Sequence, residues 1–118
     1  MARVLLVDND ASLRRALVRT MQLAGFEVEQ FASVESLLAA GATEREACLV
    51  LDVDMPGVGG VEFKRALMQA GRDRPTVFIT ASGREGLEAD LARLAPVAVL
   101  HKPFDKEDLL QALGRAFA

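Results

Sequence analysis

The amino-acid sequence predicts an α/β fold in which a doubly wound, five-stranded parallel sheet carries helices on both faces. Two observations and one general rule lead to this prediction. Five short, mostly apolar segments alternate with five segments whose apolar residues recur at helical spacing. Several of the apolar segments show no polar alternation, which is typical of strands buried on both faces. Right-handed crossovers between such strands place helices on both sides of a parallel sheet.

Length and composition predict one globular domain over residues 1–118. Hydrophobic residues make up 51% of the chain and charged residues 26%, as in ordinary folded proteins. The formal net charge is −3 and the basic residues are scattered, which argues against direct nucleic-acid binding. No apolar run is long enough to span a membrane, and Asp8 interrupts the first one too early for a signal peptide, so we expect a cytoplasmic protein. The single cysteine, Cys48, excludes an internal disulfide and is expected in the core.

The first strand is expected at residues 3–7, an apolar run that ends in the segment Asp8-Asn9-Asp10. A helix follows as far as Gly25, with Asp10 or Ser12 as its N-cap. Its apolar face is expected to consist of Leu13, Leu17, Met21 and Ala24.

Residues 26–31 alternate between apolar and polar, which predicts a half-covered strand near a sheet edge. Ser33 is expected to cap a helix over residues 34–40 that ends at Gly41, and residues 43–46 form a polar connector.

The central strand is expected at residues 47–51, which run without polar alternation into Asp52. The turn-forming residues in segment 55–60 end this strand and lead into a helix over residues 61–70. The next strand, residues 75–80, is again mostly apolar and ends on the hydroxyl of Thr80.

A loop over residues 81–86 precedes a short helix that carries Leu87, Leu91 and Leu94 at helical spacing. The fifth strand, residues 95–101, leads to Lys102, and Asp105 is expected to cap the last helix. The apolar stripe of that helix is expected to consist of Leu109, Leu110, Leu113 and Phe117.

Four of the five predicted strands end in or next to a polar side chain that could take part in binding or catalysis: Asp8, Asp52, Thr80 and Lys102. The carboxyl ends of parallel strands share one edge of a sheet, so these four side chains are expected to converge there. Each has an ordinary structural explanation when taken alone, as a helix cap, a strand-favouring residue or a solvated charge. Asp52 is the exception, because a carboxylate after a fully apolar strand needs a cation or hydrogen bonds to compensate its burial.

Carboxylates and a backbone carbonyl together make the all-oxygen kind of site that Mg²⁺ prefers. A lysine and a hydroxyl nearby can bind the oxygens of a phosphoryl group, whose charge the metal neutralises during transfer. This set of groups predicts that Asp52 is a nucleophile that forms an aspartyl phosphate.

With these residues identified, the whole chain resembles the receiver domain of two-component response regulators. The resemblance implies a flavodoxin-like fold with strand order 2-1-3-4-5, and a signalling switch rather than an enzyme, with self-catalysed phosphorylation and dephosphorylation at most. The motifs that carry it are Val4-Leu5-Leu6-Val7-Asp8-Asn9-Asp10, Leu51-Asp52-Val53-Asp54-Met55-Pro56-Gly57, Phe78-Ile79-Thr80-Ala81 and Lys102-Pro103-Phe104.

The resemblance also implies a role for each site residue. Asp52 matches the phosphoacceptor and also a ligand of Mg²⁺, together with Asp8 and the main-chain carbonyl of Asp54. Lys102 matches the lysine that pairs with the acceptor and then with a phosphoryl oxygen, and Thr80 matches the hydroxyl that binds such an oxygen.

The implied partners are a sensor histidine kinase or a phosphotransfer protein as donor, and an output domain or protein target. The target would bind the face formed by the fourth helix, fifth strand and fifth helix. A homodimer that forms on phosphorylation, the cognate kinase and the output are left open by the sequence. So is the choice between a stand-alone receiver and part of a longer regulator.

Three positions depart from the family pattern. Asn9 stands where most members have a second acid that binds the metal, so we expect weaker Mg²⁺ affinity, and the sequence leaves open whether Asn9 or Asp10 is a ligand. Val99, three residues before Lys102, replaces a Tyr or Phe whose rotamer follows the threonine, so the relay must differ or be weakened. His101 is expected to be a solvated or partly covered residue rather than a pH sensor.

Two other functions remain open at this stage. Asn9 and Val99 favour a pseudo-receiver, an interaction module of the same fold that phosphate does not regulate, whereas the intact Asp52, Thr80 and Lys102 oppose it. The Asp-x-Asp pattern at residues 52–54 also fits a phosphatase of the haloacid-dehalogenase type. The order of elements opposes that alternative, because acids precede this pattern and 118 residues leave no room for a cap domain.

Overall fold

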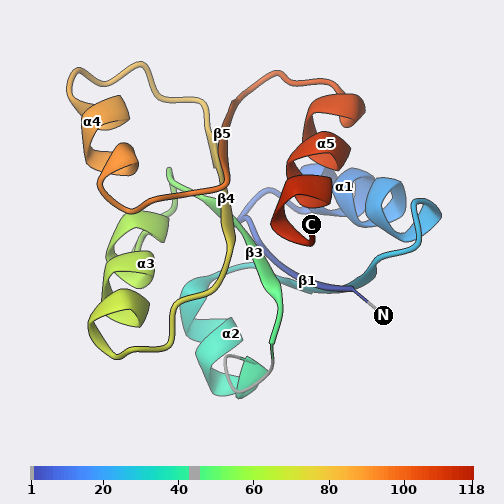
Figure 1. Cartoon of the computed structure of the whole chain (residues 1–118), viewed down its shortest axis with the longest axis horizontal. Coiled ribbons are helices and arrows are strands. Elements are labelled where there is room, and N and C mark those ends of the chain that lie inside the picture. Colours follow the sequence, from blue (N-terminus) through green and yellow to red (C-terminus); the bar gives the residue numbers. More distant parts are fainter. Residues whose placement is uncertain (1, 43–45) are drawn as a thin grey trace.

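The computed structural model describes residues 2–42 and 46–118 of the chain. Its strands form one parallel sheet in the order β2-β1-β3-β4-β5, and helices alternate with them along the sequence (Figure 1). The predicted fold class is confirmed, including the strand order that the resemblance implied. No helix in the described part of the chain is long and apolar enough to cross a membrane.

The elements begin and end within a few residues of the predicted positions. The strands are β1 (Arg3–Val7), β2 (Glu27–Phe31), β3 (Cys48–Asp52), β4 (Thr76–Thr80) and β5 (Ala98–His101). The helices are α1 (Ala11–Leu23), α2 (Val34–Ala39), α3 (Gly60–Gln69), α4 (Leu87–Ala92) and α5 (Lys106–Ala116).

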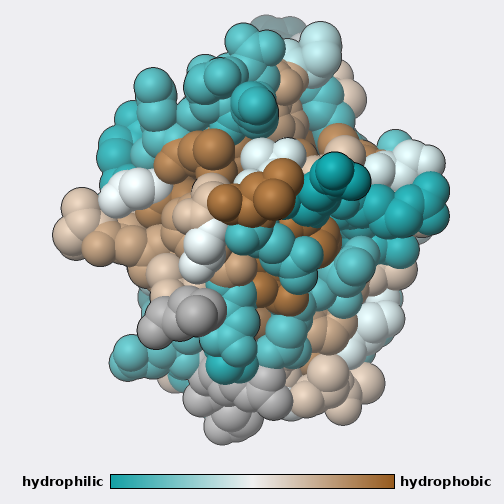
Figure 2. Space-filling view, turned by 90° about the vertical axis from the view of Figure 1, so that its right-hand side faces the viewer, coloured by the Kyte–Doolittle hydropathy of each residue, from teal (hydrophilic) through white to brown (hydrophobic). Residues whose placement is uncertain are grey.

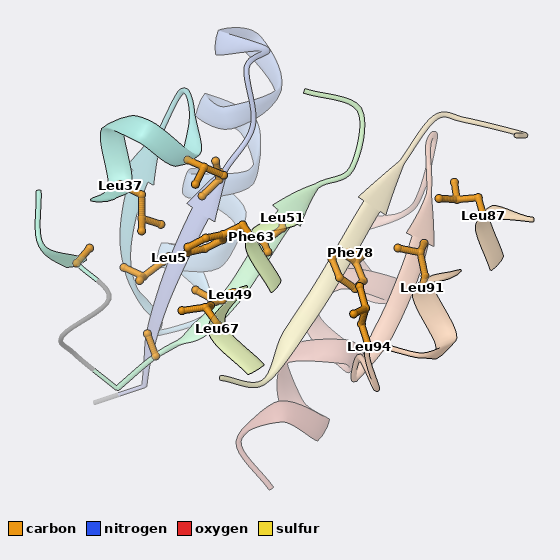
Figure 3. Close-up of a cluster of buried hydrophobic side chains, with 14 residues drawn as sticks. Leu5, Leu37, Leu49, Leu51, Phe63, Leu67, Phe78, Leu87, Leu91 and Leu94 are labelled. Atoms are coloured by element: carbon orange, nitrogen blue, oxygen red, sulfur yellow. The ribbon is translucent and has the colours of Figure 1, made fainter. Parts of the chain in front are cut away.

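The sheet separates two hydrophobic cores, because successive strand residues point to opposite faces. Helices α1 and α5 cover one face and α2, α3 and α4 cover the other (Figure 1). The strands contribute Val4, Leu6, Cys48, Val50, Val77 and Ile79 to the core under α1 and α5. They contribute Leu5, Val7, Leu49, Leu51 and Phe78 to the core under α2, α3 and α4, where Phe63, Leu67, Leu87 and Leu91 meet them (Figure 3).

Burial along the strands matches the sequence pattern. Every residue of β3 and β4 is buried, whereas β2 pairs only with β1 and keeps exposed residues. The predictions of a fully buried central strand and a half-covered edge strand are therefore confirmed. Cys48 lies in the core as expected, and burial raises the pKa of its thiol to about 12, which keeps it protonated and unreactive.

The fifth strand is shorter than predicted, since it begins at Ala98 rather than at residue 95. Ala95 adopts the left-handed conformation, with φ of 49°, and Pro96 has no N–H to donate. The first bond to β4 is therefore made by the N–H of Val97, which donates to the Thr76 carbonyl at 2.8 Å.

The predicted apolar faces of the first and last helices each contained one residue too many. Ala24 is the C-cap of α1 and is exposed. Phe117 is the C-cap of α5 and is 40% exposed, although its ring lies 5.7 Å from that of Phe26. Both residues follow the last helical turn, where the apolar stripe no longer faces the sheet. Residues 43–45 of the predicted polar connector lie outside the described residues.

One lysine is buried at a distance from the strand ends that carry the candidate site. Only 1% of the Lys64 side chain, on α3, is exposed. Its ammonium group donates to the Asp73 carboxylate and to the main-chain carbonyl of Arg74, the latter at 2.8 Å. Asp73 also accepts the N–H of Arg74 at 2.8 Å. These bonds fix the loop between α3 and β4, and nothing in the local sequence pattern distinguishes Lys64 from a surface lysine.

We expect Asp73→Asn to destabilise the protein more than Lys64→Met does. The first change leaves a buried ammonium without its counter-charge, whereas the second removes the charge and keeps the apolar stem. The Asp73 side chain is 49% exposed, so water offsets part of the lost charge interaction. We therefore expect Asp73→Asn to lower the free energy of unfolding by ~2 kcal/mol. Urea unfolding of both variants measures the difference, with Glu85→Gln in an exposed loop as the control. Equal losses for the two variants would show that the charge pair is not what matters.

Candidate functional site

The parallel register brings the ends of four strands to one edge of the sheet. Val7 pairs with Leu51, so Asp8, which directly follows β1, and Asp52, the last residue of β3, lie at the same level on neighbouring strands. Asp52 pairs with Ile79, one residue before Thr80. The N–H of Lys102 donates to the Thr80 carbonyl at 2.8 Å, which extends the ladder beyond β5. The residues that the sequence singled out are thus assembled by main-chain pairing.

Asp8 and Asp52, which we call the acidic pair, are held in the same way. The Oδ1 atom of Asp8 accepts the N–H of Asp10 at 2.8 Å, and Oδ1 of Asp52 accepts the N–H of Asp54 at 2.9 Å. Each carboxylate is therefore oriented by the backbone two residues further along. Asp8 is fully buried and Asp52 is 2% exposed, so neither group relies on bulk water for solvation.

The second oxygens of the acidic pair both face Lys102. The Lys102 Nζ atom lies 3.4 Å from Oδ2 of Asp8 and 3.6 Å from Oδ2 of Asp52. Oδ2 of Asp8 is buried and accepts no hydrogen bond. One ammonium group therefore faces two carboxylates, which leaves the centre of the site short of positive charge.

Burial raises the pKa of Asp52, and the nearby charge of Asp8 raises it further. The N–H of Asp54 and the Lys102 ammonium oppose this shift without cancelling it. The raised pKa means that the ionised carboxylate is stabilised less than in water, which keeps it basic and reactive toward an electrophile.

Thr80 is fully buried, and its hydroxyl does not contact the acidic pair directly. Its Oγ1 atom donates to Oδ2 of Asp54 at 3.1 Å, and the same oxygen accepts the N–H of Ala81 at 2.8 Å. The sequence assigned only the main-chain carbonyl of Asp54 to the site and missed its side chain. The available signal was the spacing, because a residue two positions after Asp52 also lies at this edge of the sheet.

The residues of the segment after β1 have different structural roles. Asp10 is the N-cap of α1, and its Oδ1 accepts the N–H groups of Ser12 and Leu13 at 3.0 and 3.1 Å. Of the two caps that the sequence allowed, Asp10 is the one used. Asn9 is exposed beside it. Among the described residues, no three His, Cys, Asp or Glu side chains form a group that could hold a metal ion by themselves.

A second side chain that the sequence analysis did not assign to the site is Arg14. Its Nη1 atom donates to the main-chain carbonyl of Asp8 at 2.7 Å, and its Nε donates to Gln30 at 3.3 Å. The guanidinium group thus ties α1 to the turn that carries Asp8. Only the fold brings it there, since the sequence pattern places Arg14 on the polar face of a helix.

The turn after β3 requires glycine where α3 begins. A Cβ atom on Gly60 would lie 2.8 Å from the main-chain oxygen of Asp52, closer than real Cβ atoms approach. The absence of a side chain therefore lets α3 start directly behind the acceptor strand. Gly57, with φ of 75°, turns the chain between the two elements.

The two remaining positions lie on β5. Val99 pairs with Phe78 and packs against the core under α2, α3 and α4. His101 is exposed, and its Nε2 lies 2.8 Å from Oε1 of Glu88 on α4. This matches the expectation of a solvated or partly covered residue at the strand end, and it adds a link between β5 and α4.

The family model for the response regulator receiver domain matches residues 4–114. The chain belongs to the response regulator receiver family. The match extends from β1 into α5 and so includes every strand end described above. Receiver domains are signalling domains of two-component systems rather than enzymes of the ordinary kind, so the phosphatase alternative is set aside.

Relatives and solved structures agree with this assignment. The chain is 35% identical over 114 residues to the C4-dicarboxylate transport transcriptional regulatory protein DctD of Pseudomonas aeruginosa, covering 97% of the chain and 25% of DctD. The chemotaxis protein CheY4 of Vibrio cholerae is 32% identical with a TM-score of 0.86, and 98% of each chain is covered. The response regulator StyR is 36% identical with a TM-score of 0.89, and 98% of this chain and 58% of StyR are covered.

The curated relatives are longer than this chain. The chain spans about a quarter of DctD and about half of the next relatives, which include transcriptional regulators. The similarity therefore concerns the receiver part of those proteins, and their remaining parts have no counterpart in the 118 residues.

We expect Asp52→Asn to stabilise the metal-free receiver at neutral pH. The pKa of Asp52 is higher in the folded protein than in the unfolded chain, so ionisation destabilises the fold. Removing this buried charge should raise the free energy of unfolding by ~1–2 kcal/mol. The gain should shrink as the pH falls through the raised pKa, because the wild type then becomes protonated. Urea unfolding across a pH series measures this, and a gain that does not depend on pH would contradict it.

Proposed function

We propose that Asp52 accepts a phosphoryl group and that the receiver works as a phosphorylation-dependent switch. The observation that carries this proposal is the pairing of Asp8 and Asp52 across a single lysine. Lys102, 24% exposed, faces both carboxylates and can also reach a group attached to Asp52. Asp52 lies at the carboxyl edge of the sheet, where parallel α/β proteins bind their ligands.

The transfer would proceed from a phosphohistidine on a partner protein. The P–N bond of the donor breaks as an O–P bond to Asp52 forms, and the imidazole leaves with the electron pair of the broken bond. Lys102 would shift its contact from the carboxylates to a phosphoryl oxygen. The Thr80 hydroxyl would donate a hydrogen bond to another phosphoryl oxygen.

The residues at the site fit a magnesium ion, which would neutralise phosphoryl charge during transfer. The fit rests on the buried Oδ2 atom of Asp8, which accepts no hydrogen bond, and on the excess of carboxylate over ammonium charge. Asp8, Asp52 and the main-chain carbonyl of Asp54 would hold the ion, with water in the other positions. We assign the remaining protein ligand to Asn9 rather than to Asp10, because the Asp10 carboxylate caps α1.

The phosphodonor would be a sensor histidine kinase or a phosphotransfer protein. A hollow of about 500 Å³ lies beside the site, between α1 and the segment after β5. Figure 2 faces the α1 and α5 side of the molecule, where hydrophobic surface lies among hydrophilic residues. A partner seated in this hollow would stand next to Lys102. The lining residues are Leu13, Ala16, Leu17, Thr20, Lys102, Pro103, Phe104 and Lys106.

The signal would leave through the face formed by α4, β5 and α5, where an output domain or protein target would bind. Val99 packs in the same core as Leu87 and Leu91 of α4. A movement at Thr80 would therefore reach α4 through packing and through the His101–Glu88 contact, not through an aromatic rotamer. Asn9 and Val99 favour a second candidate, a pseudo-receiver that binds partners without phosphate regulation.

Incubation with Mg²⁺ and acetyl phosphate should yield an acid-stable, hydroxylamine-labile adduct on Asp52. Intact-mass measurement and peptide mapping detect it, and Asp52→Asn should yield none because it lacks the nucleophilic oxygen. A wild type that forms no adduct at any Mg²⁺ concentration would refute the switch and support the pseudo-receiver.

Asn9→Asp should strengthen Mg²⁺ binding on the order of tenfold, because it restores a charged ligand beside Asp8. Titration followed by amide chemical shifts compares the two proteins without phosphodonor. Glu85→Gln, which removes an exposed carboxylate outside the site, is the control and should bind Mg²⁺ like the wild type. Equal affinities of Asn9→Asp and wild type would refute a ligand role for residue 9.

A further inference from the structure

The side chain of Asp54 occupies donors that a phosphoryl group would need. We propose that the Asp54 carboxylate is an internal competitor for the phosphoryl group. In the unphosphorylated protein it holds the Thr80 hydroxyl and the Ala81 N–H, and it must leave before a phosphoryl oxygen can take them. This inference rests on the proposed function of Asp52 as phosphoacceptor.

Two converging donors form a small anion-binding site, and the Asp54 carboxylate of the same chain occupies it. A single oxygen, Oδ2 of Asp54, lies 3.1 Å from Oγ1 of Thr80 and 2.8 Å from the N atom of Ala81. A phosphoryl oxygen that replaced Oδ2 of Asp54 at the Thr80 hydroxyl would therefore also lie within reach of the Ala81 N–H. A negatively charged oxygen is the kind of acceptor that two converging donors favour.

The Asp54 carboxylate and a phosphoryl oxygen cannot both bind the Thr80 hydroxyl and the Ala81 N–H at the same time. A threonine hydroxyl has one proton to donate, and the Thr80 proton is used by Asp54. The Thr80 oxygen meanwhile accepts the N–H of Ser82 at 2.9 Å, which restricts rotation of the hydroxyl toward another acceptor. The Ala81 N–H is likewise a single donor. A phosphoryl oxygen gains these bonds only if the carboxylate gives them up.

Charge and exposure make the carboxylate displaceable. Asp54 is exposed, so its carboxylate can turn into water, whereas Asp8 and Asp52 are buried and held in place. A phosphoryl group on Asp52 would bring negative charge toward a region that already holds these carboxylates, where Lys102 is the cation that faces Asp8 and Asp52 among the described residues. Repulsion then drives Asp54 outward, and the cost of that movement lowers the affinity of the site for the phosphoryl group.

The experiment measures binding of beryllofluoride, a phosphoryl analogue, in the presence of Mg²⁺. We compare the wild type with Asp54→Ala, which removes the competing acceptor and keeps the main-chain carbonyl. Asp54→Ala should bind on the order of tenfold more tightly, since charge-assisted hydrogen bonds no longer have to be broken. Asp54→Asn should fall between the two, because its amide oxygen still accepts but carries no charge. Asp54 is exposed, so both variants should fold, which circular dichroism checks.

Two further measurements separate direct competition from general charge repulsion. Glu85→Gln removes an exposed carboxylate from the neighbouring loop, and it should leave the affinity unchanged. In a Thr80→Val background, the gain from Asp54→Ala should shrink, because one of the two contested donors is gone. In the metal-free protein, Asp54→Ala should speed exchange of the Ala81 amide proton with solvent, a readout that needs neither metal nor analogue.

Each outcome decides a specific point. Tighter binding by Asp54→Ala that shrinks without the Thr80 hydroxyl supports the competitor. If Asp54→Ala binds beryllofluoride as weakly as the wild type or more weakly, the competitor role is overturned and the proposed function of Asp52 stands. The same holds if Glu85→Gln gains as much affinity as Asp54→Ala. Failure of every variant and the wild type to bind beryllofluoride overturns the proposed function and this inference with it.

Discussion

The site depends on two buried carboxylates that share one ammonium group. Asp8 and Asp52 have lost most contact with water, and each has one oxygen fixed by a backbone N–H, so their remaining oxygens must face the centre. Lys102 compensates one negative charge of the two. An arrangement of this kind is unfavourable in an ordinary core. It makes chemical sense where a cation or an electrophile completes it.

The rest of the fold keeps that arrangement in place. The parallel ladder sets the level at which each strand ends, and two hydrophobic cores clamp the sheet between its helices. Lys64 offers a contrast within the same chain. It is as deeply buried as the acidic pair, but a carboxylate and a carbonyl satisfy its ammonium group, so its contacts explain it as a structural anchor. Incomplete charge compensation, rather than burial alone, distinguishes the strand ends as the candidate functional site.

The sequence predicted what depends on strand periodicity and missed what depends on side-chain reach. Asp52 and Lys102 could be found because apolar strands stop directly before or beside them, and parallel strands end at a common edge. The contact of Asp54 with Thr80 joins residues 26 positions apart and depends on the turn geometry after β3. The fixed place of Arg14 and the burial of Lys64 likewise arise only when elements pack together. The sequence predicted that β5 begins at residue 95, three residues too early. The reason is local, because the left-handed conformation of Ala95 cannot be read from the sequence.

Asn9, which departs from the family pattern, and the Asp54 side chain both influence the distribution of charge within the site. Asn9 removes a negative charge beside Asp8, on the side of the site where a cation would be held, whereas Asp54 directs one toward Thr80 and Ala81. A carboxylate near Asp8 attracts a cation, but one over the hydroxyl and amide donors opposes an incoming anion. In the proposed switch, both residues would make the phosphorylated state harder to reach while leaving Asp52 and Lys102 in place. The proposed phosphoacceptor site would therefore combine the geometry of Asp8, Asp52 and Lys102 with an electrostatic environment that favours the unphosphorylated state.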